Sequence, residues 1–231
     1  LRLNGSVSGY YRAYSNVPDY DMASFNGTLG LGTISDKLTV SLSGVYGNTL
    51  LNGSGYRQNY GGMAFVRKSL GKSTAISLDG GYQLLRYTAL NQNRNGTLTT
   101  ASLRLDRKAK LPGAPIFSAT AYYGRERNSQ GRGDFARRIL GGRLGVTGSL
   151  APKITVFTSA GLARWRYDAP DLLFGSLRRD WYKSADGAVQ FELRTGLTLR
   201  IEGQYVQDDA TIPLYRFTQK QAALVLRREW Q

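Results

Sequence analysis

The sequence predicts an all-β protein in which residues 1–231 form a single domain, a transmembrane, antiparallel, up-and-down β-barrel of about twelve strands. Three observations predict this fold class. Apolar and polar residues alternate along nearly the whole chain, short and long connections follow one another in turn, and there is no run of about 18 apolar residues that could form a membrane-spanning helix. With 28 Gly, 6 Pro and 11% aromatic residues, the composition also differs from that of a disordered chain.

The alternation is clearest in residues 37–46, where Leu38, Val40 and Leu42 share one face and the residues between them are small and polar. A period of two is typical of a β-strand, because successive side chains point to opposite faces. The same pattern predicts about twelve strands, at residues 1–14, 22–33, 36–47, 56–69, 73–88, 96–109, 114–126, 135–150, 153–166, 179–194, 196–207 and 215–230.

The connections between these strands differ in length in a regular way. Short ones are predicted at residues 33–36, 69–72, 150–153 and 194–196, with a somewhat longer one at 110–114. Longer polar ones are predicted at residues 14–22, 47–55, 89–95, 127–134, 167–178 and 207–214. Bacterial outer-membrane barrels have short periplasmic turns and longer extracellular loops. The alternation therefore predicts a barrel in the bacterial outer membrane with both termini in the periplasm.

A membrane also explains why such strands close into a barrel, since in hydrocarbon every backbone N–H and C=O needs a partner. The alternative is a soluble barrel or sandwich with one wet face. A soluble sheet would carry charges on its outer face, whereas here one face of the strands is apolar and aromatic without interruption.

The start of the chain opens directly into an alternating segment, so we expect a mature or trimmed product without a signal peptide.

The polar face of the strands is predicted to line a narrow lumen that carries both signs of charge. We expect the lumen-lining residues to include Arg104, Asp106, Arg143, Asp186, Glu192, Arg200 and Glu202. Two interpretations remain open at this stage. The arginines could set the selectivity of a pore, or salt bridges could fill the interior.

The formal net charge of +15 comes from 31 Lys and Arg against 16 Asp and Glu, and much of the excess lies near the long connections. Arginine binds phosphate groups through two parallel hydrogen bonds. We therefore expect contacts to lipopolysaccharide or another anion from Arg125, Arg127, Arg132, Arg138, Arg178 and Arg179. Nucleic acid is not an expected partner, because the basic residues follow strand ends and form no recognised nucleic-acid-binding motif.

Catalysis is not expected. The chain has no His and no Cys, which excludes a Ser-His-Asp triad, histidine-ligated metals and every cysteine nucleophile. Asp208 and Asp209 are adjacent carboxylates at a predicted loop, and Asp168 and Asp171 form a second acidic loop. Neither pair has the spacing of a calcium-binding loop. We expect no metal and no cofactor, and treat hydrolysis by a carboxylate alone as the least favoured alternative.

The end of the chain resembles the C-terminal assembly signal of bacterial outer-membrane barrels, because apolar residues alternate toward the near-terminal aromatic Trp230, with Gln231 as a departure. Together with the segments at 178–180 and 212–215, it resembles barrels that follow tetratricopeptide repeats, such as surface lipoprotein assembly modifiers. The resemblance covers about the last fifty residues. It implies a secretion barrel with a periplasmic helical repeat domain as partner, and this chain contains no such repeats.

These observations favour a channel or export conduit in the outer membrane, for an anionic solute, a polymer or a secreted protein. The alternative is a plugged barrel that anchors a larger envelope complex. Outer-membrane lipid and lipopolysaccharide are the expected surroundings, and a periplasmic partner domain or secretion complex is the expected partner. The sequence leaves the oligomeric state open.

Overall fold

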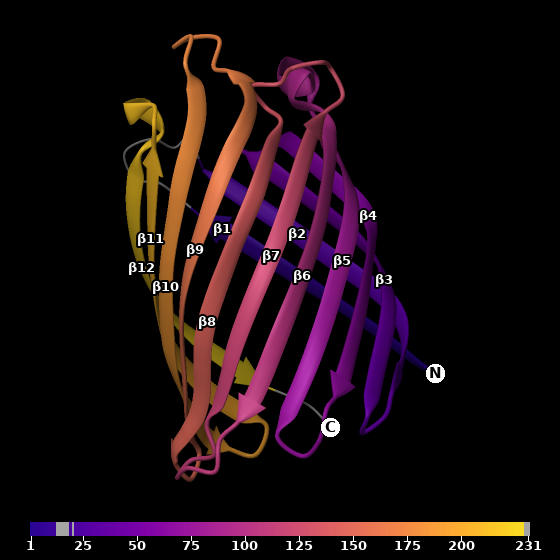
Figure 1. The fold of residues 1–231 in the computed structure, drawn as a ribbon, viewed down its shortest axis with the longest axis vertical. Helices are drawn as coiled ribbons and strands as arrows, with labels where there is room; N and C mark the ends of the chain where they lie inside the picture. Colours follow the sequence, from indigo (N-terminus) through magenta and orange to yellow (C-terminus); the bar gives the residue numbers. More distant parts are fainter. Residues whose placement is uncertain (13–18, 20, 229–231) are drawn as a thin grey trace.

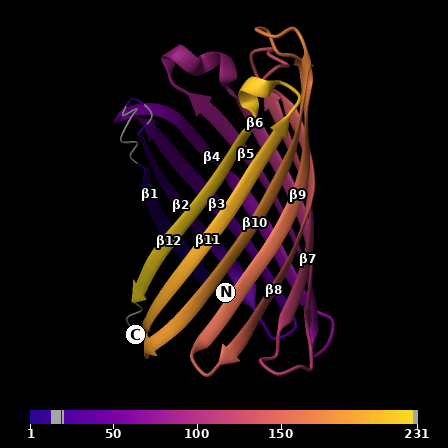
Figure 2. The same ribbon diagram turned by 90° about the vertical axis from the view of Figure 1, so that its left-hand side faces the viewer.

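Twelve antiparallel strands form the chain in the computed structural model, which describes residues 1–12, 19 and 21–228 (Figures 1 and 2). In chain order the elements are β1 (Arg2–Arg12), β2 (Met22–Ile34), β3 (Leu38–Leu51), β4 (Ser54–Ser69), β5 (Thr74–Tyr87), the 3₁₀ helix η2 (Ala89–Arg94), β6 (Gly96–Lys108), β7 (Ile116–Asn128), β8 (Arg137–Ala151), β9 (Ile154–Pro170), β10 (Leu177–Arg194), β11 (Leu197–Ala210), the 3₁₀ helix η3 (Pro213–Tyr215) and β12 (Phe217–Arg228). The predicted all-β, up-and-down architecture is confirmed. Trp230 and Gln231, which carry part of the predicted assembly signal, lie outside the described residues.

Each strand pairs with its neighbour in sequence, so the sheet order is β1 to β12 without a crossover. The sheet curves around a central space, and β1 begins and β12 ends toward the lower end of the barrel in Figure 1. Within the described residues, backbone pairing runs from β1–β2 to β11–β12, and no ladder joins β1 to β12. We call this line between the first and last strands the seam.

Apart from the turn between β3 and β4, short and long connections lie at opposite ends of the barrel, as the sequence predicts. The turns at residues 35–37, 70–73, 152–153 and 195–196 lie at the lower end with the longer connection at 109–115, whereas η2, η3 and the connections at 129–136 and 171–176 lie at the upper end. The lower end therefore corresponds to the periplasmic side, and the upper end to the extracellular side.

One predicted long loop is wrong. Residues 47–55 were expected to form a polar connection, but β3 continues to Leu51 and β4 begins at Ser54, which leaves only Asn52 and Gly53 in the turn. Both have positive φ, 47° and 70°. An Asn-Gly pair with this backbone matches the right-handed twist of the flanking strands and closes the tightest kind of hairpin. A two-residue hairpin turn is therefore found where the polarity of the residues predicted a longer loop.

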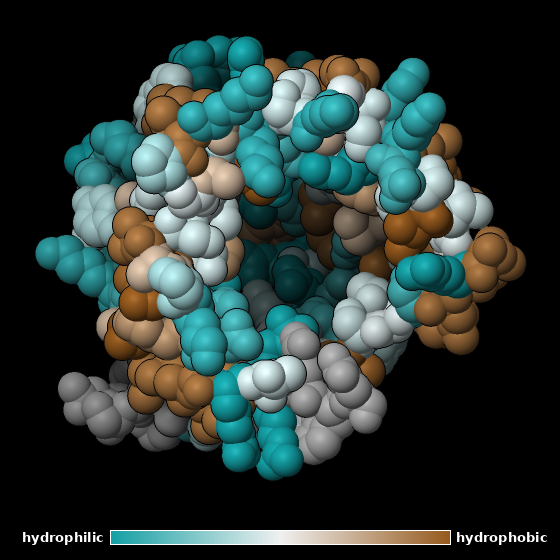
Figure 3. Space-filling view, turned by 90° about the horizontal axis from the view of Figure 1, so that it is seen from below, coloured by the Kyte–Doolittle hydropathy of each residue, from teal (hydrophilic) through white to brown (hydrophobic). Residues whose placement is uncertain are grey.

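The two faces of the sheet differ as the alternation predicts. On the outer face Leu42, Leu140 and Leu144 are 66%, 66% and 67% exposed, respectively. Figure 3, seen from the lower end, shows hydrophobic patches on the outside, hydrophilic residues at the near rim, and hydrophilic residues within a central opening. The buried apolar residues are mostly alanines, so the barrel has no conventional hydrophobic core. None of the helices among the described residues is long and apolar enough to cross a membrane.

Candidate functional site

The middle of the lumen contains a polar cluster centred on Arg143 of β8 and Asp186 of β10. The Arg143 Nη1 donates a hydrogen bond to Asp186 Oδ1 at 2.9 Å, and Ser159 of β9, which lies between them, donates to the same oxygen at 2.9 Å. The strand register aligns Ser159 with Asp186 and Gly145 with Ser159, so three neighbouring strands contribute. Arg143 is itself aligned with Gly161, two residues from Ser159, so the cluster joins inward-facing side chains at two successive levels of the barrel.

A second ion pair lies beside this cluster, on β11. Arg200 Nε is 3.0 Å from Glu202 Oε2, and the Arg200 guanidinium lies 4.8 Å from the centre of the Phe157 ring. Arg143, Asp186, Arg200 and Glu202 line one cavity with a volume of about 320 Å³. Four of the seven predicted lumen residues are therefore brought together in one place, and opposite charges are paired within it.

Arg104 and Asp106 form a separate cluster toward the lower end of β6. Asp106 is 6% exposed, and it accepts hydrogen bonds from Arg104 Nε at 2.7 Å and from Arg67 Nη1 of β4 at 2.5 Å. The sequence analysis did not predict Arg67 as a lumen residue. Its ion pair with Asp106 joins β4 to β6 over the intervening strand β5, and the periodicity within a single strand does not reveal such a contact. Glu192, the last predicted lumen residue, lies at the lower rim and forms no ion pair among the described residues.

The extracellular mouth carries a denser group of side chains, which we call the mouth cluster: Arg137, Trp165, Tyr167, Arg178, Asp180, Asp208 and Tyr215. Arg178 is its centre. The Arg178 guanidinium lies 3.9 Å from the centre of the Tyr215 ring and 4.7 Å from that of Tyr167, and its Nη2 is 2.7 Å from Asp180 Oδ2. These contacts join the upper ends of β9 and β10 to η3.

Two carboxylates in the mouth cluster are buried but differently partnered. Asp180 is 0% exposed and accepts hydrogen bonds from Arg178 Nε at 2.8 and 3.0 Å. Asp208 is 1% exposed, neither of its carboxylate oxygens has a hydrogen-bond partner, and Arg178 Nη2 is 3.8 Å away. A buried carboxylate without hydrogen bonds carries a desolvation penalty. Asp208 and Asp209 were expected in a loop, but both lie in β11, where pairing with β10 continues. The Asp208 side chain, the least favoured catalytic candidate, is buried in the mouth cluster.

Arginine also contacts acidic and aromatic residues in the loops above the mouth. Arg132 donates two hydrogen bonds to Asp134, at 2.8 and 2.6 Å, and this interaction lowers the pKa of the Asp134 carboxyl. Tyr215 Oη donates to Asp171 Oδ2 at 2.7 Å, which lowers the pKa of Asp171. These loops and the mouth cluster surround a small cavity of about 170 Å³. The extracellular end of the lumen is therefore narrowed by paired side chains.

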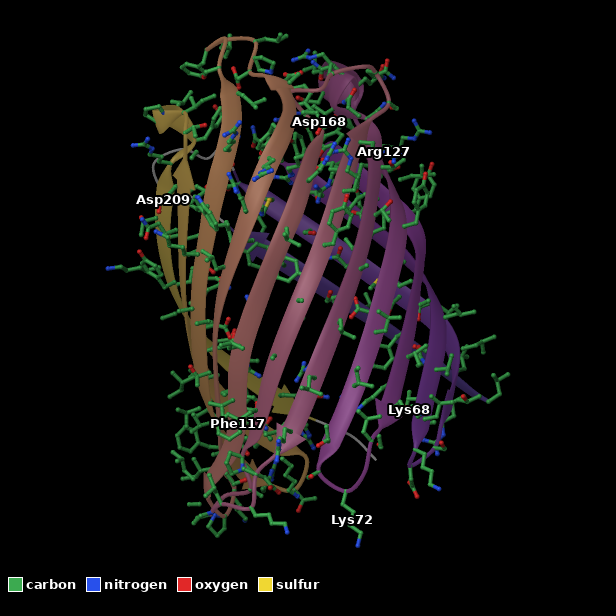
Figure 4. All side chains as sticks on the ribbon, viewed as in Figure 1. Lys68, Lys72, Phe117, Arg127, Asp168 and Asp209 are labelled. Carbon is green, nitrogen blue, oxygen red and sulfur yellow. The ribbon has the colours of Figure 1, made fainter. Side chains whose placement is uncertain are left out.

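The six arginines expected on the outer surface fall into two groups. Arg125, Arg127, Arg138 and Arg179 lie on the outer side of their strands, and Figure 4 shows Arg127 near the upper end of the barrel. Arg132 and Arg178 do not lie there. Arg132 is held by Asp134 and by the ring of Phe135, 4.6 Å away, and Arg178 faces into the mouth cluster. In β10, strand alternation places Arg178 and Arg179 on opposite faces.

Comparisons with known proteins agree with this architecture. A family model described as surface lipoprotein assembly modifier matches residues 1–230. Among solved structures, the NanC porin is similar with a TM-score of 0.58 at 11% identity, over 98% of this chain and 99% of the porin. The β domain of the Bordetella autotransporter BrkA aligns with a TM-score of 0.40 at 18% identity, over 99% of this chain and 98% of that domain. No curated protein matches the sequence. At such identity the porin supports the fold alone.

Proposed function

Because the chain belongs to the surface lipoprotein assembly modifier family and folds as an outer-membrane β-barrel, we propose that it is the conduit through which lipoprotein chains reach the cell surface. A lipoprotein has two parts that are stable in surroundings of opposite polarity. Its polypeptide requires polar surroundings, whereas its acyl chains are stable only in lipid. A conduit for such a substrate must offer a polar path that communicates with the bilayer.

The single observation that carries the proposal is the seam beside a polar lumen. No backbone ladder joins β1 to β12 among the described residues, while every other neighbouring pair is hydrogen-bonded along its length. Among the described residues, the seam is thus the line at which the barrel wall can open with the fewest backbone hydrogen bonds to break. We propose that the polypeptide crosses in the lumen while the acyl chains pass along the seam within the lipid.

The lumen supports the polypeptide half of this proposal. Its charges are already paired, as in Arg143 with Asp186 and Arg200 with Glu202. Paired charges hold a transiting chain less strongly than an unpaired field of one sign, so the chain can leave again. The hydroxyls and carboxylates along the wall also provide hydrogen-bond partners for an extended backbone.

The experiment that tests the proposal locks the seam. The chain has no native cysteine, so Val7→Cys on β1 and Leu224→Cys on β12, at positions 89% and 70% exposed, can be joined by a flexible bismaleimide. The control joins Ile201→Cys to Leu224→Cys, which are register partners on β11 and β12 and do not span the seam. The readout is protease digestion of acyl-labelled lipoproteins on intact cells.

We expect the seam lock to reduce the digested fraction at least severalfold and the control lock to leave it unchanged. Equal display with the seam locked would contradict passage along the seam. If deletion of the chain itself leaves lipoprotein display unaltered, the conduit function fails as a whole.

The mouth cluster favours a second candidate function, a closed barrel that anchors an envelope assembly. Arg178, Tyr167 and Tyr215 pack together at the extracellular end, where an open pore would need free space. Planar-bilayer conductance separates the candidates. Discrete steps from folded, inserted protein favour a conduit, whereas silence that persists in a variant with the mouth cluster removed favours the anchor.

A further inference from the structure

Four arginines lie side by side on the outer face of the barrel: Arg125 on β7, Arg138 on β8, Arg166 on β9 and Arg179 on β10. The strand register aligns Arg125 with Arg138, Arg138 with Arg166, and Arg166 with Arg179. We call this set the arginine row. Neighbouring strands are about 4.8 Å apart, so the row extends about 14 Å around the barrel.

Such a row is electrostatically unfavourable on its own, because like charges directly opposite each other on neighbouring strands destabilise a sheet. Asp168 is its nearest counter-ion. It accepts hydrogen bonds from Arg125 Nη1 at 2.8 Å and Nη2 at 2.5 Å, and lies 4.0 Å from Arg138 Nε. Arg166 and Arg179 are exposed and make no ion pair with any described residue. The row thus retains a surplus of positive charge that an external anion would neutralise.

The height of the row in the membrane identifies the kind of anion. Two residues closer to the bilayer centre, β7, β8 and β10 carry Tyr123, Leu140 and Trp181, which are 43%, 66% and 45% exposed. At the same level β9 carries Arg164, whose guanidinium lies 5.4 Å from the centre of the Trp181 ring. Exposed Tyr and Trp residues mark the interface between hydrocarbon and headgroups. Asp168 and Arg127, which lies two residues beyond Arg125, are at the upper end of the barrel in Figure 4. The row is therefore level with the headgroups of the outer leaflet.

We propose that the arginine row is a binding site for the phosphate groups of the phosphorylated glycolipid of the outer leaflet. Each guanidinium can donate two parallel hydrogen bonds to one phosphate, and adjacent guanidiniums can share a phosphate between strands. Arg138, Arg166 and Arg179 contact the lipid directly, and Asp168 holds Arg125 beside them. The site is independent of the lumen, of the seam and of the function proposed above.

The test uses diphosphorylated lipid A added to the folded full chain in detergent, with the midpoint temperature of heat-induced barrel unfolding as the readout. The variant is Arg138→Gln with Arg166→Gln. The control is Arg107→Gln, an exposed arginine at the lower end of β6. Lipid A without phosphates, phosphatidylglycerol and inorganic phosphate are compared as ligands.

We expect lipid A to stabilise the wild type and the Arg107→Gln control alike, and to bind the double variant at least about tenfold more weakly, since two charge-assisted hydrogen-bonding groups are lost. Arg138→Lys with Arg166→Lys, which keeps charge but not bidentate geometry, should bind with intermediate affinity and serves if the glutamine variant does not fold. The proposal is overturned by equal binding to all variants, or by equal stabilisation from dephosphorylated lipid A or phosphatidylglycerol. It is also overturned if inorganic phosphate stabilises the wild type as strongly as lipid A does.

Discussion

The guanidinium of Arg178 lies 3.9 Å from the centre of the Tyr215 ring, and this contact connects the upper end of β10 to η3 at the mouth of the barrel. A cation over an aromatic face is attracted by the ring's electron distribution. Tyr215 is also hydrogen-bonded to Asp171, so one side chain ties the β9–β10 loop and η3 to the barrel wall. The mouth cluster is therefore a candidate gate at the extracellular end of the lumen.

The first prediction concerns this gate. Tyr215→Ala removes both the ring beneath Arg178 and the hydrogen bond to Asp171, so we expect single-channel conductance in a planar bilayer to increase severalfold. Tyr215→Phe keeps the ring and loses only the hydroxyl, and serves as the matched control with little change. Unaltered conductance in Tyr215→Ala would show that this cluster does not limit passage.

The second prediction compares the two buried carboxylates. Asp180→Asn leaves the half-buried Arg178 guanidinium without the carboxylate that forms its closest ion pair, and should lower the free energy of unfolding by about 3–5 kcal/mol. Asp208→Asn removes a buried charge whose oxygens have no hydrogen-bond partner, and we expect unchanged or higher stability. Denaturant unfolding in lipid vesicles measures both. A larger loss in Asp208→Asn than in Asp180→Asn would contradict the assigned pairing.

The third prediction concerns charge near the lower end of the lumen. Asp106 is shared by Arg67 and Arg104, so Asp106→Asn leaves two neighbouring arginines without their anion. We expect the reversal potential in a salt gradient to move toward anion selectivity. The control is Asp209→Asn, since Asp209 is ion-paired with Lys183 on the outer surface and appears on β11 in Figure 4. The idea fails if both variants shift the potential equally.

The fourth prediction tests which face contacts lipid. Leu144 is 67% exposed near the middle of β8, so Leu144→Arg should cost about 2–4 kcal/mol of unfolding free energy in vesicles. Gln204→Arg places the same charge in the lumen, where Asp186 is its register partner, and should cost less than about 1 kcal/mol. Similar losses of unfolding free energy in the two variants would contradict the assignment of one face to lipid and the other to the lumen.

The fifth prediction concerns pH and the β9–β10 loop. The hydrogen bond from Tyr215 lowers the pKa of Asp171 in the folded state below its ordinary value of 3.8. A lowered carboxyl pKa contributes stability that is present above the unfolded-state pKa and is lost as the pH falls through the folded-state pKa. The protection of the backbone amides of residues 171–176 against hydrogen exchange, measured relative to the intrinsic exchange rate at each pH, should therefore fall below about pH 4. In Asp171→Asn this loss of protection should be absent, and its persistence would assign the effect to another group.

Much of the fold follows from the sequence because strand periodicity is local. The alternation around Leu38, Val40 and Leu42 fixes a strand and its two faces without reference to any other segment. The turn at Asn52 and Gly53 could also have been predicted, since an Asn-Gly pair is a hairpin signal. The polarity of the surrounding residues led instead to the prediction of a loop.

Less of the candidate site than of the fold could be predicted from the sequence, because the contacts of the site depend on the register between strands. The sequence alone determined a membrane barrel with a charged inner face, since a period of two and alternating connections are properties of single segments and their order. Only the tertiary structure decided that Arg67 reaches Asp106 across β5, that Arg178 faces inward while Arg179 faces outward, and that Arg166 joins a row on four strands. The physical reason is that hydrogen-bond register, which aligns residues far apart in sequence, is set by the closing of hairpins and the curvature of the whole sheet.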